Sequence, residues 1–137
     1  MTPTTTSRPS LAPDDALSAI LALATKQHGG GRFAFRAHDS ELQEIFSDLA
    51  EEYDWLPKVF VFSNTGPRPF SPDLNDSIAK LQLAGLLGRE NPDYQIIFLR
   101  PAAQGYFDKV LAPRLDKESV EQLERVASAF IAKVRLV

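Results

Sequence analysis

The stretch of sequence that decides the fold is SPDLNDSIAKLQLAGLLGRENPDYQIIFL, residues 71–99. Ser71 is a favourable N-cap, Pro72 suits the first turn of a helix, and Gly85 can end one in a left-handed conformation. Apolar residues recur between them at helical spacing, which predicts a helix over 72–85. The side chains expected to face inward are those of Leu74, Ile78, Leu81 and Ala84.

The second half of this stretch predicts a β-hairpin over 86–99. Two apolar runs, 86–89 and 94–99, flank Asn91-Pro92-Asp93, which is a turn-forming sequence. A helix followed directly by a hairpin is the arrangement of the reading helix and the wing in a winged-helix domain.

Three elements are expected before this stretch. The first is a helix that begins at Pro13 and stops at Gly29, and the second is a brief strand over 33–35. The third is a helix capped by Asp39 or Ser40. The apolar stripes of the two helices are Leu17, Ile20, Leu21 and Ala24 in the first, and Leu42, Ile45, Phe46, Leu49 and Tyr53 in the second.

Two helices are expected after the hairpin, a short one over 101–111 and a final one from residue 117, capped by Asp116. The resulting order of elements indicates a helix-rich α+β domain of winged-helix type over 13–137, behind a flexible Thr/Pro-rich tail over 1–12. The long segment 55–70 departs from this pattern, because an ordinary helix-turn-helix has a turn of about 3–4 residues there. Within it, 59–62 is expected to be extended and buried.

The overall composition excludes several classes of protein. The chain has 137 residues, 44% of them hydrophobic and 24% charged, which fits one ordinary globular domain. It has no cysteine, and therefore no disulfide, thiolate metal site or cysteine nucleophile. No apolar run approaches the roughly 20 residues of a membrane-spanning helix, and no secretory signal is recognisable, so a cytoplasmic protein is expected. The net charge of −3 argues against a generally basic surface.

One combination of motifs covers about a third of the chain, from residue 60 to residue 105. It consists of the turn Gly66-Pro67-Arg68-Pro69-Phe70-Ser71, the helix that ends in Gly85-Leu86-Leu87, and the run 94–99 followed by Gly105. This pattern resembles the bacterial YwgA-like proteins and the Panacea (SocA-like) antitoxin-associated domains. The resemblance implies a winged-helix-like architecture and a role as an antitoxin-like or defence-associated regulator.

DNA binding is one function that a winged helix allows, because the third helix of such a domain can enter the major groove. The residues that could read bases or contact phosphate are Arg68 before the helix, Asn75, Lys80 and Gln82 on it, and Arg89 on the hairpin. Asp73 and Asp76 on the same helix would face the polyanion, and the helix has a net charge of −1. The charge pattern therefore does not favour DNA as the partner.

Protein binding fits the charge pattern better. The outer face of the second helix carries Glu41, Glu44, Asp48, Glu51 and Glu52 with no basic residue to offset them. This face either attracts a basic partner or simply keeps the domain soluble. The broad apolar surface of the final helix is explained either by a symmetric homodimer or by burial within the chain. The candidate interface residues are Glu44, Asp48, Glu51, Phe130 and Val134.

Signals for catalysis or for a cofactor are weak. His28 and His38 are the only histidines, and an enzyme or metal site centred on His38 and Asp39 would need further converging groups. Glycines 29–31 match neither a P-loop nor a dinucleotide fingerprint. The sequence thus predicts no cofactor. The leading hypothesis is that the protein is a non-catalytic regulatory module, which binds an unidentified protein or a second copy of itself. A DNA-binding transcription regulator is the alternative, and a small enzyme at His38 and Asp39 is the weakest hypothesis.

Overall fold

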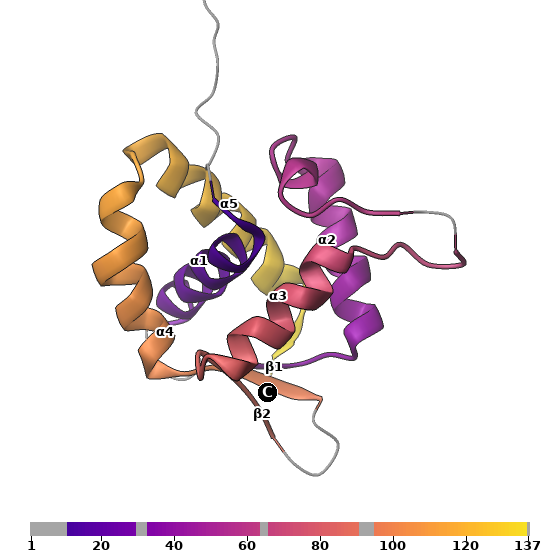
Figure 1. Ribbon diagram of the computed structural model, residues 1–137, viewed down its shortest axis with the longest axis horizontal. Helices are drawn as coiled ribbons and strands as arrows, with labels where there is room; N and C mark the ends of the chain where they lie inside the picture. The colour runs from indigo at the N-terminus through magenta and orange to yellow at the C-terminus, as the bar shows by residue number, and fades with distance from the viewer. Residues whose placement is uncertain (1–10, 30–32, 64–65, 91–94, 137) are drawn as a thin grey trace, which may run out of the picture.

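The computed structural model describes residues 11–29, 33–63, 66–90 and 95–136, apart from the side chain of Asp39. It confirms a helix-rich α+β fold with a small antiparallel sheet (Figure 1). The helices are α1 (Pro13–Gln27), α2 (Asp39–Glu52), α3 (Pro72–Leu83), α4 (Pro101–Tyr106) and α5 (Lys117–Lys133), with the short helical segments η1 (Leu56–Lys58), η2 (Phe107–Leu111) and η3 (Ala112–Arg114). The strands are β1 (Ala34–Arg36), β2 (Leu87–Glu90), β3 (Ile96–Leu99) and β4 (Arg135–Leu136). The expectations for residues 1–10, for glycines 30–31 and for the turn Asn91-Pro92-Asp93 lie outside the described residues.

The helix predicted over 72–85 is α3, and both of its ends form as expected. The Ser71 hydroxyl accepts a hydrogen bond from the Leu74 N–H at 3.3 Å. Gly85 ends the helix with a left-handed φ of 77°. Ala84 differs from the prediction, because it is the exposed C-cap and does not face inward. The buried apolar residues of α3 are Leu74, Ile78 and Leu81, as predicted.

The predicted hairpin is formed by β2 and β3, which pair in antiparallel register. Gly88 lies opposite Phe98, and a Cβ atom added at Gly88 would overlap the phenyl ring. The glycine therefore allows the ring to lie directly against the backbone of the neighbouring strand.

The sheet has the strand order β2-β3-β1-β4. β1 pairs antiparallel with β3, so it joins the hairpin in one sheet. The prediction placed this strand at 33–35, one residue before its observed position. β4 was not predicted: Arg135 and Leu136 leave the end of α5 and pair with β1 on its other side.

The first helix is buried more completely than one apolar stripe would predict. Ten consecutive residues, from Ala16 to Thr25, are buried. Figure 1 shows that α1 runs through the middle of the molecule, and α5, α3 and α4 pack against it. A helix that is apolar on most sides is stable only when its neighbours cover those sides, and here they do.

The two helices expected after the hairpin are present. α4 and the π-helical η2 together occupy the range 101–111 that was predicted as a short helix. Asp116 caps α5, because its Oδ1 accepts a hydrogen bond from the Ser119 N–H at 2.8 Å.

The apolar surface of α5 belongs to the core of the chain. Phe130 is completely buried, and its ring lies 5.2 Å from the ring of Phe35 and 5.4 Å from that of Phe46. The prediction of Phe130 as an interface residue is therefore wrong, because the folded chain already covers it. Val134, the C-cap of α5, is half-buried against the same core. Of the two explanations for the apolar surface of α5, burial within the chain is therefore the correct one.

The segment between α2 and α3 differs from its prediction. Residues 59–62 are not an extended buried piece, because η1 precedes them and Val59 keeps helical backbone angles of φ −91° and ψ −49°. Phe60 is buried, whereas Val61 is 61% exposed. Ser63 and Phe70 then exchange two backbone hydrogen bonds of 2.8 and 3.1 Å, which close the base of a loop. We refer to residues 61–63 and 66–70 as the α2–α3 loop.

Candidate functional site

The candidate nucleic-acid contacts lie on α3, β2 and the α2–α3 loop. Asn75, Lys80 and Gln82 are exposed on α3. The structure joins two of the candidates directly, because the Arg89 Nε donates a hydrogen bond to the Gln82 Oε1 at 3.2 Å. Arg68 is directed to a different element, and its Nη1 lies 3.5 Å from the Glu44 Oε1 on α2.

The solvent-facing side of α3 is chemically mixed. Asp76, Ala79, Lys80 and Leu83 are exposed and are spaced by three and four residues, so they are neighbours on one face. Leu83 is 88% exposed, more than any other exposed large hydrophobic residue in the described part of the chain. The segment 66–100 carries four basic and four acidic residues. This surface therefore lacks the positive charge that is typical of a DNA-reading helix and wing.

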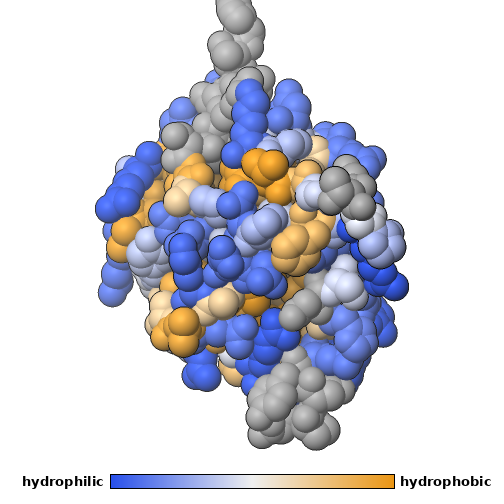
Figure 2. All heavy atoms as spheres, turned by 45° about the vertical axis from the view of Figure 1, so that its right-hand side comes forward, coloured by the Kyte–Doolittle hydropathy of each residue, from blue (hydrophilic) through white to orange (hydrophobic). Residues whose placement is uncertain are grey.

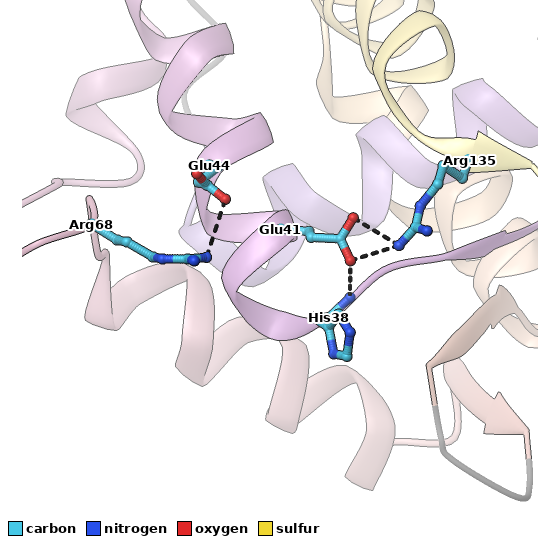
Figure 3. A network of polar contacts seen from close by, with 5 residues as sticks. All are labelled: His38, Glu41, Glu44, Arg68 and Arg135. Carbon is cyan, nitrogen blue, oxygen red and sulfur yellow. Dashed lines mark hydrogen bonds and ion pairs between the residues drawn. The ribbon is translucent and has the colours of Figure 1, made fainter.

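The N-terminus of α2 is capped by His38, and not by Asp39 or Ser40 as predicted. The His38 N–H donates to the Glu41 carboxylate at 3.1 Å, as in a capping box. From β4, the Arg135 Nη2 donates to both oxygens of the same carboxylate, at 2.7 and 2.9 Å (Figure 3). The hydrogen bond from His38, together with the charge of Arg135, holds the pKa of the Glu41 carboxyl below its ordinary value of 4.5.

The acidic face of α2 is partly neutralised, which corrects the prediction that no basic residue offsets it. Arg135 pairs with Glu41 and Arg68 pairs with Glu44, and both arginines reach α2 from distant segments (Figure 3). The remaining acidic residues of this face, which are exposed and form no ion pair among the described residues, are Asp48, Glu51 and Glu52.

The base of the α2–α3 loop is fixed to α2 by a side chain that sequence reasoning missed. Gln43 is only 5% exposed, and its amide accepts from the Ser71 N–H at 2.7 Å and donates to the Ser71 carbonyl at 3.1 Å. The rings of Phe60 and Phe46 meet edge to face with centroids 5.6 Å apart. Gln43 lies beside the apolar stripe of α2, where a polar residue is ordinarily taken for a solvated one. Its partner is 28 residues away in the chain, so no local pattern reveals the contact.

Two hydrophobic side chains project from the anchored loop. Val61 is 61% exposed and Phe70 is 45% exposed. The backbone at Val61 is held in place, because its N–H donates to the Asp73 Oδ2 at 3.3 Å. The contact between Arg68 and Glu44 ties the same loop to the acidic face of α2. Figure 2 turns this side of the molecule forward and shows hydrophobic side chains scattered among hydrophilic ones.

The histidines take no part in a metal site within the described residues. The ring of His28, just after α1, meets that of Phe33 at 5.3 Å, and His38 is exposed at the start of α2. In the described part of the chain, no group of three or more His, Asp or Glu residues is placed to hold a metal ion. The side chain of Asp39, the predicted companion of His38, lies outside the described residues.

Comparisons with known proteins do not assign the chain to a family. No family model matches it, and neither a curated protein nor a solved structure matches it. Among the described residues, no helix is both long and apolar enough to pass through a bilayer. The geometry of α3 and of the α2–α3 loop is therefore the basis for a functional proposal.

Proposed function

We propose that this chain is a non-catalytic regulatory module of the cytoplasm that acts by binding a protein partner. The observation that carries the proposal is the balanced charge of the segment that forms α3 and the hairpin, together with the exposure of Leu83 on α3. Protein interfaces use apolar anchors within mixed charges, whereas the phosphates of DNA require a basic surface. An antitoxin-like or defence-associated regulator, which the resemblance implies, is a module of this kind.

A DNA-binding transcription regulator is the second candidate function. The succession of α3 and the β2–β3 hairpin favours it, because a winged-helix domain places its third helix in the major groove. Asn75 and Lys80 are exposed on that helix, but Arg89 contacts Gln82 and Arg68 contacts Glu44. Phosphate contacts by these arginines would compete with those interactions. Two or three phosphate contacts also give only weak and salt-sensitive binding.

If the chain forms a dimer, the interface does not include the buried residues of α5. Phe130 is buried in the single chain, so a dimer through this side chain would require the chain to unfold in part. A different protein is accordingly the partner that we favour. An enzyme centred on His38 and Asp39 gains no support from the exposed position of His38.

Cross-linking in cells, followed by affinity purification of the tagged chain, tests the proposal. We expect a specific protein to co-purify after nuclease treatment, and an unrelated domain with the same tag not to capture it. Fluorescence anisotropy with genomic DNA fragments at about 50 mM salt, where phosphate contacts are strong, should show no saturable binding. Saturable binding that Lys80→Glu and Arg89→Glu both weaken would replace the proposal with the second candidate.

A further inference from the structure

We infer that the outer face of α2 and the α2–α3 loop together bind a basic, amphipathic segment of the protein partner. This inference rests on the proposed function, because it names the surface and the class of partner for the same activity. We call this region the α2–loop surface. Its residues are Glu44, Asp48, Glu51, Val61 and Phe70.

The carboxylates of this surface form a row on the face of α2 that points away from the core. Glu44, Asp48 and Glu51 are separated by four and three residues, so they occupy successive turns on one face of α2. The opposite face is fixed in the core, where Phe46 and Leu49 are buried. The row therefore presents a line of negative charge to the solvent at a defined position.

Val61 and Phe70 supply exposed apolar side chains on the α2–α3 loop, which the pair between Arg68 and Glu44 ties to this face of α2. The loop that carries them is held by the hydrogen bonds between Gln43 and Ser71 and by the two backbone bonds between Ser63 and Phe70. Because these bonds fix the loop before any partner arrives, little additional ordering is needed on binding. An exposed apolar pair on a fixed loop is the kind of feature that a partner's hydrophobic side chains can cover.

The charge of the row selects the chemistry of the partner. Lysine and arginine side chains would pair with its carboxylates, whereas nucleic-acid phosphates would be repelled. A second copy that docked the same face symmetrically would bring like charges together, which disfavours a homodimer through this surface. The pair between Arg68 and Glu44 is 3.5 Å long, with side chains 61% and 50% exposed, so a cation of the partner can take its place with little loss.

Fluorescence anisotropy of the full chain with synthetic peptides tests the inference. Three labelled helical peptides of about 15–18 residues, long enough to form a helix, are compared. The first has lysines on one face and leucines on the other, the second has glutamates in place of the lysines, and the third has serines in place of the leucines. We expect saturable binding of the first peptide, weakened by added salt, and binding of the other two that is at least about tenfold weaker.

Matched charge reversals locate the binding site. Asp48→Lys/Glu51→Lys on α2 and Glu121→Lys/Glu124→Lys on α5 change the net charge equally, and each replaces two exposed acidic residues three positions apart. We expect the α2 pair to weaken binding of the lysine–leucine peptide by about tenfold or more, and the α5 pair by less than about twofold.

A third variant tests the apolar anchor. Val61→Ser/Phe70→Ser should weaken binding of the same peptide by about fivefold or more, because its leucines lose the side chains that they cover. Circular dichroism verifies that each variant keeps its helices. If a charge reversal unfolds the chain, Asp48→Asn/Glu51→Gln replaces it, because these changes preserve the shape of the side chains.

Three results would overturn the inference. They are no binding of the lysine–leucine peptide, equal binding of the serine peptide, and equal losses in the α2 and α5 variants, which would mean that net charge alone explains binding. Its failure is distinguishable from failure of the proposed function. If the α2 variant still captures the cross-linked partner, the function stands and the assigned surface is wrong. If the unaltered chain captures no protein, the proposed function itself fails.

Discussion

The α3–hairpin region and the α2–α3 loop adjoin each other but are held by different kinds of interaction. In the first, the contacts that begin the helix and form the hairpin are local, although β3 also pairs with β1: Ser71 caps α3 three residues along the chain, and β2 pairs with the next strand. In the second, Gln43 binds Ser71 across 28 residues, and Arg68 meets Glu44 across 24. Short-range signals therefore build α3 and the hairpin, whereas long-range side-chain contacts build the surface to which we assign partner binding.

The largest loss of stability is expected from a substitution in the core that packs against both regions. Phe130 contacts Phe35 in the sheet and Phe46 in α2. Phe130→Ala should lower the free energy of unfolding by about 3–5 kcal/mol, because it leaves a cavity beneath both regions. Chemical denaturation followed by circular dichroism measures this change, with the exposed Lys133→Ala as the control. A stable Phe130→Ala variant that only dissociates a dimer would contradict the burial of this ring.

The next largest loss of stability is expected from a substitution in the α3–hairpin region. Gly88→Ala places a Cβ atom against the Phe98 ring and should cost about 1–3 kcal/mol of stability through overpacking. The matched control is Gly105→Ala in α4, where an added Cβ meets nothing within 4 Å. Thermal unfolding compares the two variants. Equal stability of both would show that the Phe98 ring moves aside freely.

A substitution that releases the α2–α3 loop should show most clearly whether the two regions open independently. Gln43→Ala leaves the Ser71 N–H and carbonyl without their partner, which should lower stability by about 1–3 kcal/mol. Hydrogen exchange followed by mass spectrometry should show faster exchange in the α2–α3 loop and unchanged exchange in β2 and β3. Equal acceleration in the hairpin would mean that the two regions open as one unit.

The smallest effect is expected at Glu41, and it depends on pH. Because the folded-state pKa of Glu41 lies below 4.5, its contribution to stability is complete above pH 4.5 and is lost as the pH falls through the lowered pKa. Glu41→Gln should therefore destabilise the chain by less than about 1 kcal/mol at neutral pH, since solvent screens the pair with Arg135. The difference in unfolding free energy should shrink as the pH falls below 4.5 and through the lowered pKa. Denaturation at a series of pH values measures it, and a constant difference would contradict the role of the charge.

The parts of the fold that the sequence predicts are those with local causes. Asp116, Ser71 and Gly85 mark helix ends through contacts or backbone angles within a few residues, and all three do so in the structure. Helical spacing likewise identified one buried face of each helix. It did not reveal that α1 is buried almost all round, because that depends on which helices pack against it.

The parts that could not be predicted depend on segments that meet only in the folded chain. Arg135 reaches Glu41 across 94 residues, and only the pairing of β4 with β1 brings them together. The two residues of β4 are too few to show a strand pattern of their own. The acidic residues Asp48 and Glu51 were identified from their spacing, but the exposed position of Val61 was not, because a run of apolar residues does not say which one faces solvent.

The position of α1 at the centre of the molecule determines when the chain can finish folding. α1 is synthesised before α5, yet Gln27 at its end bonds to α5 residues that follow 97 and 101 positions later. One side of α1 therefore has no cover until α5 has been made. We expect nascent or truncated chains that end before residue 117 to bind chaperones and to be cleaved by proteases, since they expose part of a helix that has ten consecutive residues buried in the folded chain.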